Sequence, residues 1–292
     1  MGGLDAVLGT GAAGALEVEL AASPARLLIQ QRTRLADRLA RLDPQGWHRS
    51  THCPLWDVAD VVIHLGDATA WALAALDGAD TPGPGSARGF DPSITPHEQV
   101  LAGRGQPPQV LLARLRKQTT AVAERLQAAK EPDEPTARWV AGQIYTTGLV
   151  GMHILWDSWL HELDLDAALS AEGMPAQAPC PAELDAAAAY GIYFTGAVAR
   201  LGLPPEQHLD LHIELDHLAY RLQVTETVRV RRAEPGAPAA GALVLRGAAV
   251  ATVAAMAGRG ELADTAHGDP LAIAVMSGVG ARMRVSAEPA TT

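Results

Sequence analysis

The hydrophobic pattern of this 292-residue chain changes after residue 202, and the change limits the folds open to it. Before that point apolar residues recur at helical spacing, as the leucines of the segment 15–43 do. After it, the stretch HLDLHIELD at 208–216 alternates polar and apolar residues, as a half-buried strand does. A long helical part followed by a strand-rich part predicts an α+β chain of two domains.

The helical part predicts a four-helix bundle, because four long helices with short or medium connections pack in that way. Apolar periodicity and Pro/Gly breaks place these helices at 15–43, 57–76, 107–130 and 142–170. The stretch GADTPGPGSARGFDPSITPH, at 78–97, is longer than a plain connection. A loop of this length is often a lid or a binding loop, and simple disorder is the alternative.

The stretch GMPAQAPCPAE at 173–183 is the expected domain boundary. We therefore place the two domains at 15–173 and 181–288. The second domain is predicted to be a small α+β unit. Its expected elements are a helix, three strands and two short helices, at 182–202, 208–216, 220–230, 241–247, 248–257 and 269–282.

Composition excludes several classes of partner. The formal net charge of -10 argues against binding to nucleic acid. Two cysteines form neither a disulfide framework nor a cysteine-based zinc motif. The first twenty residues lack the basic start of a signal peptide, and no run approaches the ~20 apolar residues of a membrane span. The sequence predicts a cytoplasmic protein with no membrane partner.

A row of polar residues crosses an otherwise apolar helix in HILWDSWLHELDL, at 153–165. Its members His153, Asp157 and His161 are four residues apart and share one helix face. His64 holds a similar place in VVIHLGD on the second helix. Three nitrogen and oxygen ligands from two helices, with one position left open, are typical of a catalytic zinc-type site. Zinc is the first choice, iron, nickel and manganese remain open, and satisfied core histidines without a metal are the alternative.

Three segments resemble signatures of the DinB-like, mycothiol-dependent maleylpyruvate isomerase family. They are CPLWDVADVVIHL at 53–65, DSWLHELDL at 157–165 and AAMAGRG at 254–260, and they occur in the family's order. The resemblance implies a DinB-like bundle with a metal site and a small, sterol-carrier-like α+β domain after it. It implies that His64, Asp157 and His161 are the metal ligands and that Arg259 handles the substrate.

One position departs from the family, which usually has Glu where this chain has Asp157. Asp is one methylene shorter, so it reaches the metal only if the helices lie closer together or a water intervenes. His153 is then expected to act as a further ligand or, as we favour, as a hydrogen-bond partner that orients Asp157.

The resemblance implies that a small thiol, mycothiol, occupies the open metal position as a thiolate. The expected reaction is thiol transfer to, or cis–trans isomerisation of, a small carboxylate-bearing electrophile. Arg259 would bind the substrate carboxylate, with a helix C-terminal cap as its alternative role. Two other functions stay open: a hydrolase or lyase that uses metal-bound water, and a binding protein without catalysis.

Cys53 stands just before the second helix, where a helix N-terminus lowers the pKa of a thiol. It is a candidate nucleophile on that ground. A structural thiol is the favoured interpretation.

Overall fold

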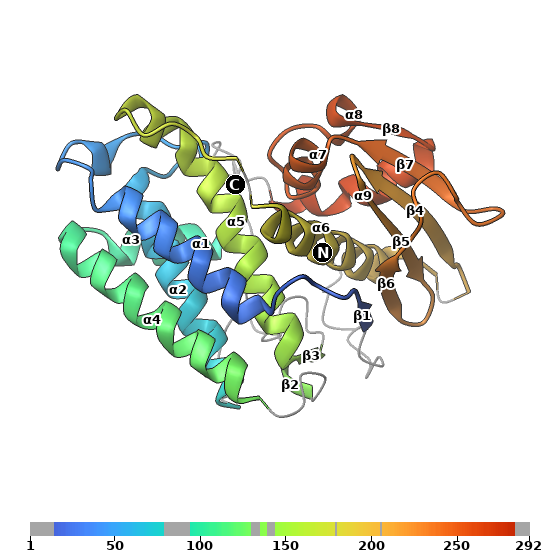
Figure 1. Ribbon diagram of the computed structural model, residues 1–292, viewed down its shortest axis with the longest axis horizontal. Helices are drawn as coiled ribbons and strands as arrows, with labels where there is room; N and C mark the ends of the chain where they lie inside the picture. Colours follow the sequence, from blue (N-terminus) through green and yellow to red (C-terminus); the bar gives the residue numbers. More distant parts are fainter. Residues whose placement is uncertain are drawn as a thin grey trace, which may run out of the picture. The chain divides into compact units, whose positions relative to one another are not determined.

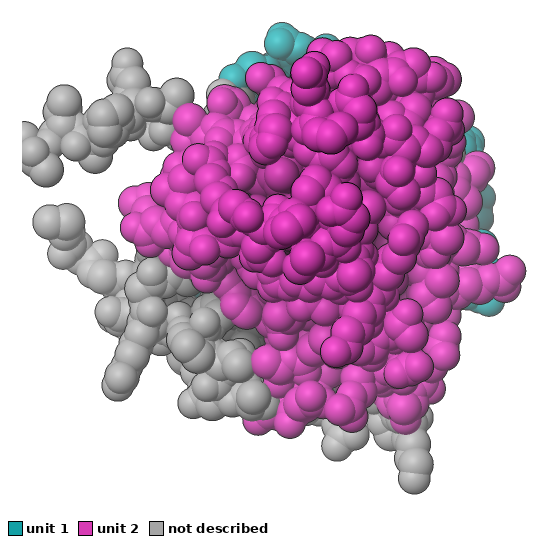
Figure 2. Space-filling model, turned by 90° about the vertical axis from the view of Figure 1, so that its left-hand side faces the viewer, with its two compact units in different colours: residues 1–21, 141–143, 184–284 teal, residues 22–140, 144–183, 285–292 magenta. Residues whose placement is uncertain are grey.

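The chain forms two compact units, described here from a computed structural model (Figure 1, Figure 2). Unit 1 comprises residues 1–21, 141–143 and 184–284, and unit 2 comprises residues 22–140, 144–183 and 285–292. The structure describes residues 15–78, 94–129, 135–138, 144–178, 180–204 and 206–283. The segment 79–93, most of the expected long loop, lies outside the described residues. A helical part followed by a strand-rich part confirms the predicted α+β class.

Unit 2 is a four-helix bundle, as the helical spacing predicts. Helices α1 and α2 each pack against both α4 and α5 but not extensively against each other, so α1 and α2 lie diagonally across the bundle. A short helix, α3, packs against α2. A 3₁₀ turn, η2, lies between α1 and α2 in the chain. A two-stranded antiparallel ribbon, β2 and β3, leads into α5. The bounds are α1 Pro24–Leu39, η2 Gly46–His48, α2 Val58–Leu76, α3 Thr95–Gly103, α4 Pro108–Ala128, β2 Pro135–Arg138, β3 Ile144–Thr146 and α5 Thr147–Ala171.

Capping residues set where these helices begin. The Ser23 side chain accepts a hydrogen bond from the Arg26 backbone, and Pro24 supplies the fixed φ of a first helical position. The prediction that this helix begins at residue 15 is therefore wrong, and residues 15–17 form a strand instead. Asp57 and Asp60 form a reciprocal capping box at the start of α2. That box fixes the first turn of the helix that carries His64.

Helix α2 is the one described helix long and apolar enough to cross a membrane by length and composition. Its apolar window is 67% buried within the protein. The core helix of a bundle passes the same test, and α2 packs against α4 and α5 along its length. Its apolar composition is therefore explained by its place in the core of unit 2.

Unit 1 is built around a six-stranded mixed sheet in the order β1-β6-β5-β4-β7-β8. The predicted strand at 208–216 is confirmed as β4, which pairs in antiparallel register with β5. Helix α6 packs closely on the sheet, because a Cβ on Gly196 would stand 2.7 Å from the Leu222 side chain. The bounds are β1 Ala15–Glu17, α6 Pro181–Gly202, β4 Leu209–Leu215, β5 Leu218–Val224, β6 Val228–Arg232, β7 Leu243–Gly247, α7 Ala249–Met256, α8 Leu262–Thr265, β8 Ala266–Gly268 and α9 Pro270–Met283.

Strand β1 pairs in parallel with β6, so residues 15–17 join the sheet of unit 1. The domain limits of 15–173 and 181–288 stay a prediction.

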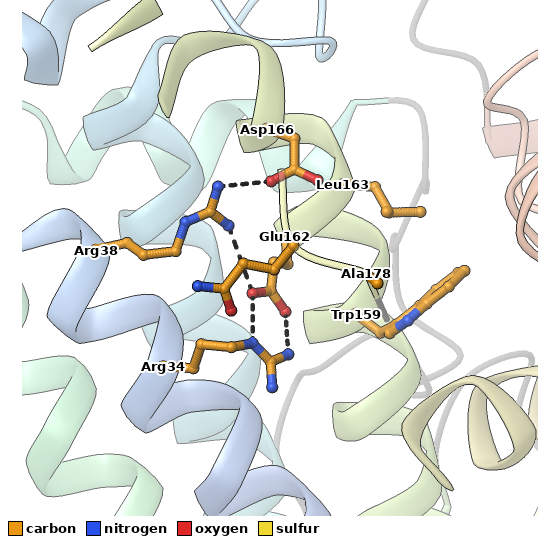
Figure 3. Close-up of a pocket in the computed structure, with 8 residues that line it drawn as sticks. Arg34, Arg38, Trp159, Glu162, Leu163, Asp166 and Ala178 are labelled. Carbon is orange, nitrogen blue, oxygen red and sulfur yellow. Dashed lines mark hydrogen bonds and ion pairs between the residues drawn. The ribbon is translucent and has the colours of Figure 1, made fainter. Parts of the chain in front are cut away.

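A seam of ion pairs and hydrogen bonds joins α1 to α5 and fixes their register (Figure 3). Gln31 bonds Ser158 and Glu162, and Arg38 bonds Asp166 further along. Because residue numbers rise together along the two helices, α1 and α5 run parallel. The cavity beside this seam has a volume of about 10 Å³, which holds no more than a water molecule. The seam is therefore a structural element that sets the height of α5 in the bundle.

Arg34 is the centre of the seam. Its guanidinium donates two hydrogen bonds to Glu162, at 2.7 and 3.1 Å, and two to Glu183, at 2.7 and 3.0 Å. Both carboxylates are buried, and their bonds to Arg34 raise its pKa further above its usual range. Arg34 thus compensates two buried negative charges at once.

Arg34→Met is expected to lower the free energy of unfolding of unit 2 by about 3 kcal/mol, because it leaves the buried Glu183 without its cation and Glu162 with the Arg38 cation alone, at 3.6 Å. Urea denaturation followed by far-UV circular dichroism measures the change. Arg26→Met, at an exposed position of α1, is the matched control and should leave stability unchanged. Equal stability of the two variants would contradict this role for Arg34.

Candidate metal centre

Three predicted ligands meet between α2 and α5. The donor atoms of His64, Asp157 and His161 all lie within 4.8 Å of one another. Asp157 Oδ1 stands 3.5 Å from His64 Nε2 and 3.6 Å from His161 Nε2. Two ligands bound tetrahedrally to zinc, at bond lengths of about 2.0–2.2 Å, lie roughly 3.3–3.6 Å apart. The three side chains are therefore spaced so that they could hold a single divalent ion, and direct ligation by the shorter Asp157 stays a prediction.

The electrostatics of His161 and Asp157 favour the protonation states that bind a metal. Burial lowers the pKa of His161, so its imidazole is neutral at pH 7. Burial alone would raise the pKa of Asp157, but the neighbouring imidazoles outweigh it and lower that pKa well below its usual range. Metal ligands must be neutral imidazole and ionised carboxylate, which are the forms favoured at His161 and Asp157.

Asp164 fixes the orientation of His161, a role that the sequence prediction missed. Its Oδ2 lies 2.9 Å from His161 Nδ1, and the residue is 1% exposed. Nδ1–H therefore donates to Asp164, and the lone pair of Nε2 is left to face His64 and Asp157. A carboxylate behind a ligating histidine is the usual support of a metal site. The signal in the sequence was the spacing of three between His161 and Asp164, which puts both on one side of α5.

His153 lies one turn before Asp157, on the side of α5 where the sequence places it. Burial lowers its pKa to about 4, against the attraction of the Asp157 charge, so its imidazole is neutral at pH 7. Its ring lies 5.9 Å from that of Trp156. The prediction that His153 orients Asp157 stays a prediction.

Cys53 lies behind His161, on the side away from Asp157. Its Sγ donates a hydrogen bond to Asp164 Oδ2 at 3.2 Å and stands 3.8 Å from His161 Nδ1. Cys53, His161 and Asp164 thus form a second group whose donor atoms could hold an ion. A thiol that donates to a carboxylate keeps its proton, which fits the structural interpretation of Cys53.

Trp56 forms an aromatic wall beside the site. Its ring centroid lies 5.0 Å from that of His64 and 5.8 Å from that of His161. Its indole Nε1 donates to His97 Nδ1 of α3 at 3.1 Å, which holds the ring in place. An apolar wall keeps water from that side of the imidazoles and strengthens electrostatic interactions in the site.

Arg259 lies in unit 1, whereas the three proposed ligands lie in unit 2. It follows α7 between two glycines with positive φ, Gly258 at 88° and Gly260 at 113°. Its backbone N–H donates to Ala254 and its guanidinium to Ala257, which is the arrangement of a helix C-terminal cap. The contact of Arg259 with a substrate stays a prediction.

Comparison with known proteins identifies relatives of this fold. A family model described as the mycothiol maleylpyruvate isomerase N-terminal domain matches residues 28–166. No curated protein matches the chain. Two crystal structures of the mycothiol-dependent maleylpyruvate isomerase are similar to it.

One of these structures is of a histidine-to-alanine mutant. Its TM-score is 0.53 and its sequence identity is 12%, and the matched region covers 84% of this chain and 91% of that chain. The other has a TM-score of 0.52 and 13% identity with the same coverage. At this identity the likeness shows the fold. It agrees with the predicted two-part α+β architecture, and the family model covers residues 28–166, which is less than half of the chain. Membership of the family and an enzymatic role stay predictions.

Proposed function

We propose that the chain is a metal-dependent enzyme that uses mycothiol, on the basis of the match of residues 28–166 to the mycothiol maleylpyruvate isomerase N-terminal domain model. It would isomerise a small carboxylate-bearing electrophile across a cis double bond, or transfer the thiol to it. The observation that carries the proposal is the placement of Asp157 Oδ1 within 3.6 Å of both imidazole Nε2 atoms.

The chain supplies three protein ligands, His64, Asp157 and His161, and a fourth position stays open for the thiol. A zinc ion held there would lower the pKa of a bound thiol, which is near 8.5 when free, so that the thiolate is present at neutral pH. Asp164 would keep His161 Nε2 directed at such an ion through its bond to Nδ1. Trp56 keeps water from one side of the imidazoles.

The isomerisation consists of reversible steps that consume no co-reactant. Mycothiol, when bound, would supply a thiolate that adds to the conjugated cis double bond and is eliminated again after rotation, which would leave the trans double bond. A cation near the developing negative charge stabilises it, which is the role the family resemblance gives to Arg259.

Small molecules are the expected partners, and we infer a cytoplasmic location, where a low-molecular-weight thiol is available. The buried position of α2 in the bundle supports a chain that folds without a membrane.

Metal analysis and calorimetry test the proposal together. The purified protein is expected to hold one divalent ion per chain, and a chelator should remove it. Mycothiol should then release heat on binding the metal-loaded protein and none on binding the metal-free protein. The proposal would be contradicted by a metal-free protein that cannot be reloaded, or by equal heats of mycothiol binding for both forms.

A further inference from the structure

An arginine occupies the middle of the core-facing stripe of α1. The stripe follows helical spacing through Ala25, Leu28, Arg32, Leu35 and Leu39, and every member is buried. Arg32 is 2% exposed, where the pattern calls for a leucine. Its neighbours Arg34 and Arg38 lie on the seam with α5 instead and have carboxylate partners there.

The guanidinium of Arg32 has no such partner. Among the described residues, none accepts a hydrogen bond from its Nε, Nη1 or Nη2. Burial lowers its pKa to about 10, so it still carries its charge at pH 7. A buried cation without hydrogen-bond acceptors destabilises a fold strongly, and replacing such a charge by an apolar residue often stabilises the fold.

The register of the bundle places Arg32 level with the metal centre. Gln31 bonds Ser158 and Glu162, so the next residue of α1 stands at the height of Asp157 and His161 on the parallel helix α5. Helix α1 lies diagonally opposite α2, so its core-facing stripe points toward the side of the bundle that carries His64.

Two carboxylates attract the Arg32 charge, and neither satisfies it. Asp157 and Glu162 both act on it electrostatically. Glu162 already accepts hydrogen bonds from Arg34 and Gln31. Asp157 lies beyond ion-pair distance, and its Oδ2 has no hydrogen-bond partner among the described residues. A group that enters the centre of the bundle would therefore meet unused donors on Arg32.

The charge balance indicates which kind of group this is. If the proposed function holds, a divalent ion, Asp157, Arg32 and a thiolate together leave one positive charge in the interior. A single carboxylate neutralises it, and a guanidinium binds a carboxylate through two parallel hydrogen bonds. Resting on the proposed function, we propose that Arg32 is the residue that binds a carboxylate of the ligand inside the bundle, beside the metal centre.

Arg32→Met distinguishes two roles of Arg32, binding of a ligand carboxylate and compensation of buried charge in the fold. Maleate, the simplest cis dicarboxylate, serves as the probe in calorimetry on the metal- and mycothiol-loaded protein. Arg32→Met should keep its metal and its mycothiol affinity but bind maleate at least ~10-fold more weakly, as loss of a charge-assisted bond predicts. Arg32→Lys keeps the charge but cannot form two parallel hydrogen bonds, so its maleate affinity should lie between those of Arg32→Met and the unaltered protein. Arg26→Met is the control and should bind as the unaltered protein does.

Thermal unfolding of the metal-free proteins distinguishes the two roles, because a structural counter-charge predicts a lower Tm for Arg32→Met and a ligand-binding role predicts a higher one. Arg32→Met should raise Tm by ~3 °C or more, because a methionine suits the apolar stripe. A lower Tm would identify Arg32 as a structural counter-charge and overturn the inference. Unaltered maleate affinity in Arg32→Met, or no maleate binding by the loaded protein, would also overturn it. The proposed function fails separately, through absence of metal or of metal-dependent mycothiol binding.

Discussion

His161→Ala is expected to abolish metal binding at the bundle centre and, with it, turnover. His161 is one of the three proposed ligands, and its Nδ1 lies 2.9 Å from Asp164 Oδ2, so its replacement removes a donor nitrogen that this hydrogen bond orients. Loss of a supporting residue alone typically lowers metal affinity ~10–100-fold, and loss of the ligand should exceed that. Metal content after dialysis, measured by mass spectrometry, should fall from one ion per chain to background.

Two further variants make this result specific. His64→Ala removes the ligand on α2 and should give the same loss, although it leaves the pair of His161 and Asp164 intact. His208→Ala, at an exposed position of unit 1, is the control and should keep its metal. Circular dichroism must show a folded protein in each case. Full metal content in both folded ligand variants would rule out this site.

The positions of the helices were predictable because their caps and periodicity are local. The bounds of α2, α4 and α6 fall close to the expected ones. The start of α1 differs from the expected residue 15 because Ser23 and Pro24 begin the helix, although leucine spacing extends before them. The pairing of residues 15–17 with β6 could not be read from the sequence, because it depends on a partner more than 200 residues away.

The row of His153, Asp157 and His161 was predictable for a similar reason, since steps of four on one helix are a local property. The seam along α5 was not anticipated, because Ser158, Glu162 and Asp166 read as ordinary polar positions. The same holds for Arg32, which lies in the segment QQRTRLADRL with two other arginines. Which of the three faces the core depends on how α1 is rotated in the bundle, and only the fold determines that.

Asp164, which holds His161 by a hydrogen bond, is expected to have a large effect on metal affinity. Asp164→Asn is expected to lower metal affinity ~10–100-fold while the fold is kept, because the amide is isosteric but uncharged. Asp164 Oδ2 accepts from both Cys53 Sγ and His161 Nδ1, and an amide cannot offer an equally strong acceptor to both. The imidazole would then lose the bond that fixes its tautomer. Competition with a chromophoric chelator measures the affinity.

Asp166→Asn is the matched control, two residues further along α5 and on the seam with α1. Asp166 accepts from Arg38 at 2.8 Å and is not among the metal-ligand groups of the described residues. Its loss should reduce stability and leave metal affinity unchanged. If the two variants lose affinity equally, the effect belongs to the general stability of the bundle. A loss confined to Asp164→Asn shows that the His161–Asp164 bond prepares Nε2 for the metal.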